Sequence, residues 1–537
     1  MQRRDVVAAA LSLTVAEVSS NARSASLDTA VTAERGNGGA LTALERAAGV
    51  SVVNTNFVPG DVRRYGAGGL GTADDSGAWR NAVSTGHLVV GGGPNQLYRL
   101  DAHVPITRAT VIDLQGATIK IAGNTQAFVR NPTSPTAMSD VGGATQGSRS
   151  LTLATPEGFA SGQWLRIVFN DYPLHDASSY PPSWARIAGM RGRVAELDTP
   201  LQVTYGRGNA QAMAYGPGAL CERFECKNGV FDGSDCTWDL GTGQGVRIGG
   251  TEYVVIRDCE FRNFRYGGKL TCAIELFTVI DARVSGCRFT GGISNFDMCD
   301  MQEARSAHFT DNVLDGSHFG CNITRTDYGL FSNNSMHGQR SREADEGLAL
   351  PRSTRGLKAY GCAAIRILGN HVSDFESPIK VDACFRYDVS HNTIFNAGLA
   401  PYNGQIALNV GSIIHGRNMS CGRIIGNHVE NCGGIGIGVT SDPVGGVIIS
   451  GNMVRSTQCA AILVAVPNAT ITANRIEDWG LLGRGDAAIH FGNGATVADN
   501  RFANATMPAA RCLAPQNSGD TNQILRDNVS ETRNPLL

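Results

Sequence analysis

The sequence predicts an all-β protein, a single right-handed parallel β-helix with one short helix capping its N-terminal end. One short template recurs eleven times between residues 256 and 530, with 22 to 36 residues between equivalent positions. Asparagine fills the same place in nine of these repeats, and glycine is frequent, at 66 of 537 residues. Short β-type repeats joined by loops of varying length are typical of a solenoid.

The template reads apolar residue, two residues, anchor, one residue, apolar residue. The anchors are Cys259, Cys287, Asn312, Asn334, Asn370, Asn392, Asn427, Asn452, Asn474, Asn500 and Asn528. Only the last repeat departs from the template, with Ser530 in place of the second apolar residue. One asparagine per coil predicts a stacked amide ladder, in which each side chain bonds to the next coil.

We divide the chain into residues 1–57, a β-helix domain at 58–530 and a tail at 531–537. The first segment is rich in Ala, Ser and Thr. Its start, Met1 to Leu13, is similar to a twin-arginine export signal, with a small-residue cleavage region at residues 21–25. The alternative is a short amphipathic helix that attaches the chain to a larger assembly. Early coils are less regular, and a small β insertion is expected at about 140–220.

A local motif opens the β-helix domain. It contains Tyr65-Gly66-Ala67, Gly69-Leu70-Gly71 and Asp74-Asp75-Ser76, followed by a short helix that Asp74 or Asp75 can cap. This motif resembles the one that opens members of the pectin-lyase-like superfamily, which includes phage tailspike depolymerases, pectate lyases and polygalacturonase-related proteins. Leu70 stands where these proteins usually have Asp. The resemblance implies an extracellular protein, either a virion tailspike or an exported bacterial enzyme, and a homotrimer by analogy with tailspikes.

The bulk composition excludes some classes of function. A net charge of −2 gives no strong field toward nucleic acid, and no apolar run is long enough to cross a bilayer. The fourteen cysteines show no C-x2-C zinc spacing. Cys259 and Cys287 occupy the ladder position, which predicts buried free thiols rather than disulfides.

A second strand precedes each anchor, and the residue twelve positions before the anchor is polar in six repeats. These residues are Arg247, Glu275, Asp300, Asn322, Lys358 and Lys380. Each lies between two inward-facing residues, so strand alternation points all six outward on one face. We expect them to form a polar column on the surface. Further polar residues gather nearby: Asp297, His318, Arg325 and Asp382.

The column suits an extended, anionic polysaccharide, with acids for catalysis in its middle and cations at its ends. Glu275 and Asp300, or Asp297 with Asp300, could be the carboxyl pair of a glycoside hydrolase without a cofactor, and a like-charged neighbour would raise the pKa of the general acid. In a polysaccharide lyase, Glu275, Asp300 and Asn322 would instead hold Ca²⁺, with Lys358 or Lys380 as the base. Arg247, Asn322, Lys358, Lys380, Asp382, Arg325 and His318 are then the expected substrate-binding residues.

Three classes of function stay open. Hydrolysis is preferred because the carboxylates outnumber what one calcium site requires. A non-catalytic carbohydrate-binding solenoid or adhesin would use the column only as a sugar contact. A mannuronan-type epimerase shares the fold, but its expected Asp-Pro-His motif is not found. Polar strand faces also occur for purely structural reasons, since opposite charges on neighbouring strands stabilise a sheet modestly.

Overall fold

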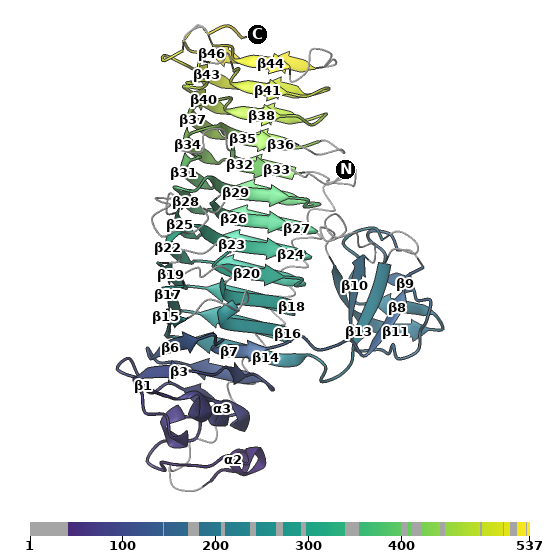
Figure 1. Ribbon diagram of the computed structural model, residues 1–537. Helices are drawn as coiled ribbons and strands as arrows, with labels where there is room; N and C mark the ends of the chain where they lie inside the picture. The colour runs from purple at the N-terminus through teal and green to yellow at the C-terminus, as the bar shows by residue number, and fades with distance from the viewer. Residues whose placement is uncertain are drawn as a thin grey trace.

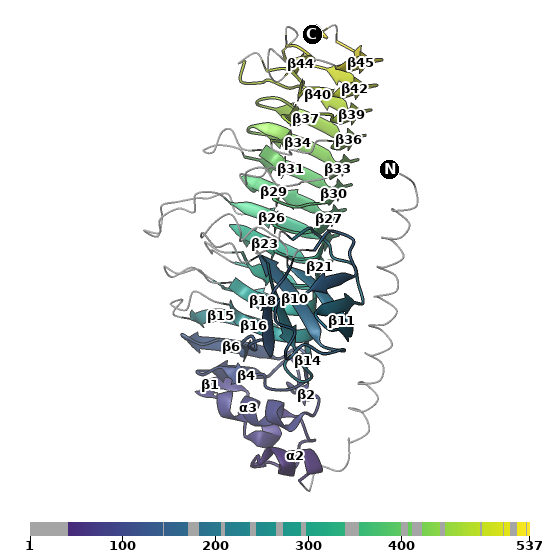
Figure 2. The ribbon, with the colours of Figure 1, turned by 90° about the vertical axis from the view of Figure 1, so that its right-hand side faces the viewer.

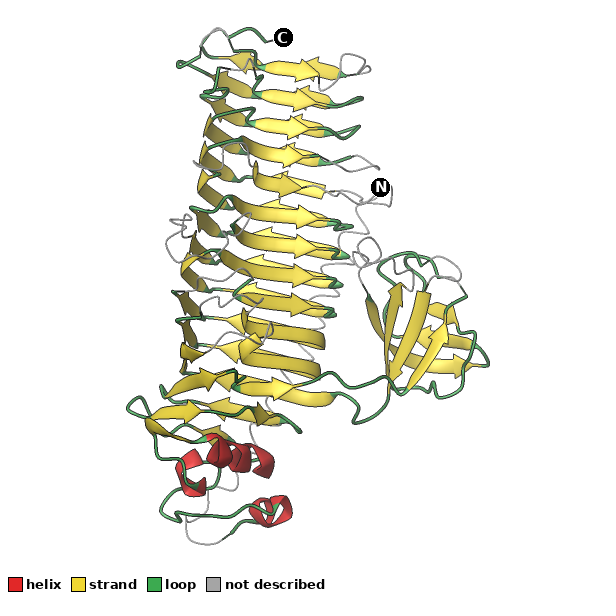
Figure 3. Ribbon diagram, in the orientation of Figure 1, coloured by secondary structure: helices red, strands yellow, loops and turns green. Residues whose placement is uncertain are grey.

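The computed structural model describes residues 41–142, 144–169, 182–205, 210–236, 243–264, 272–291, 297–338, 354–398, 406–410, 422–440, 446–483, 486–507, 510–515, 523–532 and 534–536. The expected export or attachment segment at residues 1–25 lies outside them. Parallel strands stack coil upon coil along a single axis, and a small sheet lies beside the stack (Figures 1 and 3). The predicted right-handed parallel β-helix is confirmed.

The coils contribute to three ladders of parallel strands. The first ladder contains β1 (Leu70–Asp74), β3 (Leu97–Leu100), β6 (Thr118–Gly123), β15 (Val230–Cys236), β17 (Glu260–Arg262), β19 (Arg288–Thr290), β22 (Val313–Ser317), β25 (Ser335–Gly338), β28 (His371–Ser373), β31 (Thr393–Ala397), β34 (His428–Cys432), β37 (Met453–Thr457), β40 (Arg475–Glu477), β43 (Arg501–Ala503) and β46 (Val529–Ser530).

The second ladder contains β4 (Val104–Pro105), β7 (Phe128–Arg130), β16 (Gly243–Arg257), β18 (Cys272–Ser285), β20 (Cys299–Gln302), β23 (Phe319–Thr324), β26 (Arg355–Tyr360), β29 (Ser377–Asp382), β32 (Ile406–Val410), β35 (Ile435–Val439), β38 (Ile462–Val464), β41 (Ile489–Phe491) and β44 (Leu513–Pro515).

The third ladder shares the long strands β16 and β18 with the second. Its other members are β2 (Val89–Val90), β5 (Thr110–Asp113), β14 (Cys221–Lys227), β21 (Ser306–Thr310), β24 (Tyr328–Ser332), β27 (Ala364–Leu368), β30 (Tyr387–Ser390), β33 (Gly422–Ile425), β36 (Ile448–Ser450), β39 (Thr470–Thr472), β42 (Thr496–Ala498) and β45 (Ile524–Arg526).

The predicted amide ladder runs from Asn312 to Asn528 between the third and first ladders. At every step, the side-chain oxygen accepts bonds from the backbone and side-chain N–H groups of the asparagine one coil earlier, at 2.8–3.2 Å. The residue before each anchor has a positive φ, for example 57° at Asp311 and 63° at Gly369. This left-handed residue turns the chain from one ladder into the next, which is why glycine or a short polar residue often stands there.

Helices close the N-terminal end of the stack, as the sequence predicts. They are α2 (Ala43–Ala48), the 3₁₀ helix η1 (Val62–Tyr65) and α3 (Ser76–Thr85). Trp79 on α3 is fully buried, with its ring 5.4 Å from that of Tyr98 and 5.6 Å from that of Phe128. The helix therefore covers the open strand edges that a first coil would otherwise expose.

The two motif aspartates have different roles at α3. The Asp74 carboxylate accepts the backbone N–H of Ser76, the first residue of α3, at 2.9 Å. Asp75 occupies the N-cap position, but its side chain accepts from the backbone of Gly68 and Arg99 instead. Further upstream, Glu45 on α2 is buried and pairs with Arg64 at 2.6 Å, so the packed end of the molecule begins before residue 58.

An antiparallel sheet of six strands interrupts the stack between β7 and β14. Its strand order is β8 (Ala137–Asp140), β13 (Ala210–Tyr215), β10 (Trp164–Phe169), β11 (Ser183–Arg191), β12 (Val194–Leu197) and β9 (Ser150–Thr152). We call residues 137–215 the inserted domain. It has its own core and lies against the flank of the stack near β18 to β24 (Figures 1 and 2).

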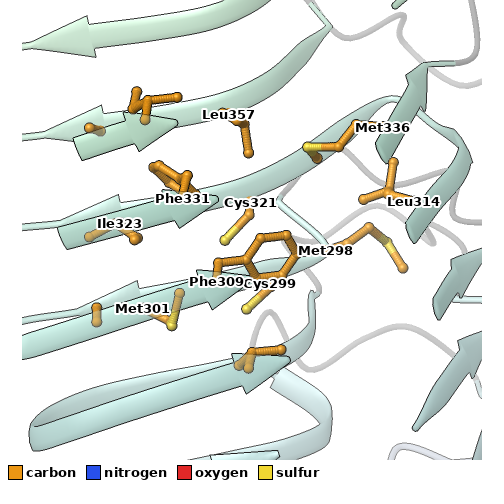
Figure 4. Close-up of a cluster of buried hydrophobic side chains, with 14 of the residues drawn as sticks. Met298, Cys299, Met301, Phe309, Leu314, Cys321, Ile323, Phe331, Met336 and Leu357 are labelled. Carbon is orange, nitrogen blue, oxygen red and sulfur yellow. The ribbon is translucent and has the colours of Figure 1, made fainter. Parts of the chain in front are cut away.

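The core of the stack is apolar and includes many thiols. Thirteen cysteines within the described residues are free, and twelve of these are buried, with Cys459 half-buried. The prediction of free, buried thiols is therefore confirmed for this part of the chain. Figure 4 shows Cys299 and Cys321 in the interior among Met298, Phe309 and other apolar side chains. None of the helices in the described segments is long and apolar enough to cross a membrane.

Candidate functional site

Strand pairing in the second ladder brings the six predicted polar residues into one column. Consecutive members are register partners: Arg247 with Glu275, Glu275 with Asp300, Asp300 with Asn322, Asn322 with Lys358, and Lys358 with Lys380. The register continues through Asn409, Gly438, Leu463 and His490. The residues on either side of the column members face the interior, such as Cys299 and Met301 around Asp300 (Figure 4).

The column is not uniformly exposed, and here the expectation that both central carboxylates face solvent is wrong. Asp300 is 0% exposed, whereas the Glu275 side chain keeps 18% of its surface. Both oxygens of Asp300 are taken by neighbours on the same face. Asn322 Nδ2 donates to Oδ1 at 3.0 Å, and Gln302 Nε2 donates to Oδ2. Asp300 is thus a buried acid held from two sides.

Burial raises the pKa of Asp300 to about 7, and the negative charges of Asp297 and Glu275 act in the same direction. The hydrogen bonds from Gln302 and Asn322 act the other way, because they favour the charged form. This carboxyl therefore holds a proton close to neutral pH. Two acids one coil apart in different environments are what acid–base catalysis on a glycosidic bond requires.

Asp297 and Lys358 form the second part of the centre. Asp297 is buried, and burial raises its pKa against the opposing charges of Lys358 and Arg355. Burial likewise lowers the pKa of Lys358, opposed by the charge of Asp297. Within the described residues, Asp297 Oδ1 and Asn322 Oδ1 are buried and accept no hydrogen bond. Both are acceptors of the kind that a sugar hydroxyl can donate to.

The cations at the ends of the column are already paired. Arg247 Nε lies 2.9 Å from Glu275 Oε2, and Arg247 also donates to Asn131 at 2.8 Å. Lys380 pairs with Asp382 at 3.0 Å, and burial raises the pKa of Asp382 against the charge of Lys380. Lys358 differs, because its ammonium lies 5.4 Å from the ring centroid of Tyr360. It is the cation best placed to act on a ligand at the centre.

The remaining two predicted residues flank the column. His318 precedes β23, four residues before Asn322, and it is buried with its pKa lowered by that burial. Arg325 lies at the corner after β23, where it pairs with Glu303 at 3.0 Å and donates to Gln302 at 3.4 Å. Arg325 thus contacts Glu303 and Gln302 at the edge of the column.

Sequence reasoning missed Arg355, which shares β26 with Lys358 and influences the Asp297 carboxyl. Its position three residues before a column member was the available signal. It also missed Arg166 of the inserted domain, which pairs with Glu303. No pattern in the chain indicates that residues so far apart in sequence meet.

The alternative calcium set has little free ligand capacity. Glu275 is paired with Arg247, and the Asp300 oxygens accept from Gln302 and Asn322. Across the described part of the chain, no three His, Cys, Asp or Glu side chains are grouped to hold a metal ion. Calcium prefers six to eight oxygen ligands, so these three residues do not fit the ion as they are arranged.

Several solved structures are similar in fold. The tailspike gp49 from Pseudomonas phage LKA1 matches with 11% identity and a TM-score of 0.43, over 88% of this chain and 83% of that one. The gp54 tailspike of Acinetobacter baumannii bacteriophage AP22, solved with a capsular saccharide, matches with 12% identity and a TM-score of 0.42, over 85% and 77%. The A-module of the Azotobacter vinelandii mannuronan C-5 epimerase AlgE6 matches with 11% identity and a TM-score of 0.37, over 88% and 98%.

Similarity at this level says nothing about activity or substrate, because one fold supports many functions. No curated protein sequence matches the chain. Residues 244–419 match the family model described as the right handed beta helix region. That stretch runs from β16 past β32, and the same parallel pairing continues on both sides of it. The chain is therefore a right-handed parallel β-helix protein.

Proposed function

We propose that this protein is a polysaccharide depolymerase that hydrolyses glycosidic bonds in an extended, anionic glycan, with Asp300 as general acid and Glu275 as the second carboxylate. The observation that supports this most is the state of Asp300. Its pKa of about 7 lets it donate a proton near neutral pH, and Glu275 is its register partner one coil away. Asp297 is the alternative partner on the same coil.

The length of the column supports an extended substrate. Five steps of about 4.8 Å separate Arg247 from Lys380, so the polar face spans about 24 Å. Lys358 supplies a cation for an acidic sugar near the centre, and the buried oxygens of Asp297 and Asn322 could accept from sugar hydroxyl groups once the side chains covering them move away. An anionic polymer of this kind belongs outside the cell, in a capsule or exopolysaccharide, and we accordingly propose an extracellular or virion location.

Spacing also supports a stereochemical proposal. Register partners in neighbouring parallel strands are about 4.8 Å apart, close to the roughly 5 Å between carboxyl groups in retaining glycosidases. We therefore favour retention of the anomeric configuration. Because Asp300 is buried, contact with the substrate requires Asn322 to move away from the Asp300 carboxyl.

A lyase is the second candidate, and one observation favours it. Burial lowers the pKa of Lys358, which would make its amine a better base for removing the proton next to a uronate carboxylate. Lys358 lies two coils from Asp300 in the same column, so both reactions would use one groove. Hydrolysis remains our first choice because Asp300 and Glu275 on neighbouring coils supply both carboxyl groups that hydrolysis needs.

The decisive experiment assays a panel of bacterial exopolysaccharides for new reducing ends and, separately, for unsaturated products. With an active glycan, Glu275→Gln and Asp300→Asn should each lower turnover by roughly 10²–10⁴-fold, as expected for loss of a general acid or base. Asp315→Asn is the matched control, because Asp315 is an exposed residue of β22 in the neighbouring ladder. Lys358→Ala and Lys380→Ala should mainly raise KM.

Each other outcome has a clear meaning. If Lys358→Ala abolishes turnover, products are unsaturated and EDTA inhibits, the lyase is correct and hydrolysis is wrong. Glycan binding without cleavage would make the protein a carbohydrate-binding solenoid. If all four column variants keep full activity, the column is only a polar strand face.

A further inference from the structure

The inserted domain meets the β-helix through polar contacts near the column. The backbone N–H of Trp184 donates to Asp327 Oδ2 at 2.8 Å, and Trp184 Nε1 donates to the Glu303 carbonyl at 3.0 Å. Arg186 pairs with Glu252 at 3.2 Å, and Arg166 pairs with Glu303. Both views place this sheet beside the same coils (Figures 1 and 2). The docking site is therefore specific.

Glu303 is the central residue of this contact. Its carboxylate accepts from Arg166 of the inserted domain, pairs with Arg325 at 3.0 Å and accepts from Thr278 Oγ1 at 3.2 Å. Its backbone has a φ of 56°, a left-handed conformation that is costly for glutamate. The surrounding contacts, including the Trp184 bond to its carbonyl, hold the corner in this conformation.

Gln302 connects that corner to the candidate acid. It directly precedes Glu303 and is the last residue of β20. Its Nε2 donates to Asp300 Oδ2, while its Oε1 accepts from Arg325 Nη2 at 3.4 Å. Arg325 therefore touches both Gln302 and Glu303. A continuous set of contacts leads from Arg166 through Glu303, Arg325 and Gln302 to Asp300.

We propose that the inserted domain is a positioning element for the candidate site: Arg166 and Trp184 fix the corner at Glu303, and Gln302 then orients the Asp300 carboxyl. This inference rests on the proposed function, because it gives the inserted domain a part in the same reaction. Gln302 and Arg166 are positioning residues, since neither needs to touch the substrate. The other charged groups that face Asp300 are Asp297 and Glu275, and all the variants below leave both unchanged.

The test measures the titration of Asp300 in two ways. One is the pH profile of turnover. The other needs no activity: the free energy of unfolding in urea is measured across pH for each variant and for the same variant with Asp300→Asn added. The difference between the two curves gives the titration of Asp300. Gln302→Met removes a bond that favours the charged carboxylate, so the titration midpoint should rise by roughly half a pH unit or more. Arg166→Met should shift it in the same direction by less, with turnover reduced about threefold to tenfold.

Arg186→Met is the matched control. It breaks a bridge between the same two parts of the molecule, but its partner Glu252 lies on β16, two strands away from β20, which carries Asp300 and Gln302. The control should leave the titration midpoint of Asp300 unchanged. Arg166→Lys keeps the positive charge, so its midpoint should lie much closer to that of the native protein than the midpoint of Arg166→Met does. The proposal is overturned if Arg166→Met leaves the midpoint unchanged, or if Arg186→Met shifts it equally. If the protein cleaves no glycan, the turnover profile cannot be measured, but the unfolding measurement still tests the positioning of Asp300. Failure of the proposed function can therefore be distinguished from failure of this inference.

Discussion

Asp300→Asn should reverse its effect on stability between acid and alkaline pH. The folded-state pKa of Asp300 is about 7 against an ordinary value of 3.8. A difference of about three pH units, at about 1.36 kcal/mol each, corresponds to about 4 kcal/mol. Because the folded state binds this proton more tightly than the unfolded state does, the stability of the native protein falls as pH rises from about 3.8 to about 7. The asparagine variant has no such loss.

The variant also has a cost that does not depend on pH. Its new amide N–H₂ faces Gln302 Nε2, which donates to Asp300 in the native protein, and this mismatch costs about 1 kcal/mol. We expect the variant to be about 1 kcal/mol less stable than the native protein at pH 4 and about 3 kcal/mol more stable at pH 8. Urea unfolding followed by tryptophan fluorescence at both pH values measures this, and Asp315→Asn should show no reversal. If the difference is the same at both pH values, Asp300 ionises normally and its assignment as general acid is wrong.

Three further predictions concern the fold and assembly. Asn370→Ala should lower the free energy of unfolding by about 2–4 kcal/mol, since it removes an acceptor for Asn334 and a donor to Asn392 inside the ladder. Thr393→Ala on the neighbouring strand is the control, and an equal loss of stability in both variants would contradict the role of the ladder. Thiol titration without reductant should find far more reactive thiols in denatured than in native protein, and six or seven disulfides by mass spectrometry would refute this. Light scattering at micromolar concentration should give a trimer, as the tailspike resemblance implies, and a monomer would end that proposal.

The repeating parts of the structure could be predicted because each depends on local pattern. The anchor template locates the turn before every coil, and a period of two along the preceding strand determines which residues face inward. Counting twelve residues back from the anchor was therefore enough to find the register of Glu275, Asp300 and Asn322. Because each coil stacks on the next, residues at equivalent positions of successive repeats become neighbours in space, which few folds allow.

Burial of Asp300 could not be predicted, because it depends on how side chains on one face lean toward each other. Gln302 and Asn322 both turn toward the carboxyl instead of extending into solvent. The docking of the inserted domain was hidden for a different reason. Arg166 and Glu303 lie 137 positions apart in the numbering and belong to segments with unrelated patterns.

The order of charges in the column argues against a purely structural role. A ladder selected only for stability would place opposite charges on neighbouring strands, because like charges directly opposite each other are destabilising. Arg247 and Glu275 follow that rule, but the next pair is Glu275 with Asp300, and Lys358 also faces Lys380. In the first pair, burial above all, and the charge of Glu275 in addition, raises the pKa of Asp300, and the second pair sets two cations side by side. Such a cost is typical of functional sites, where perturbed carboxyl groups and concentrated charge serve binding and catalysis.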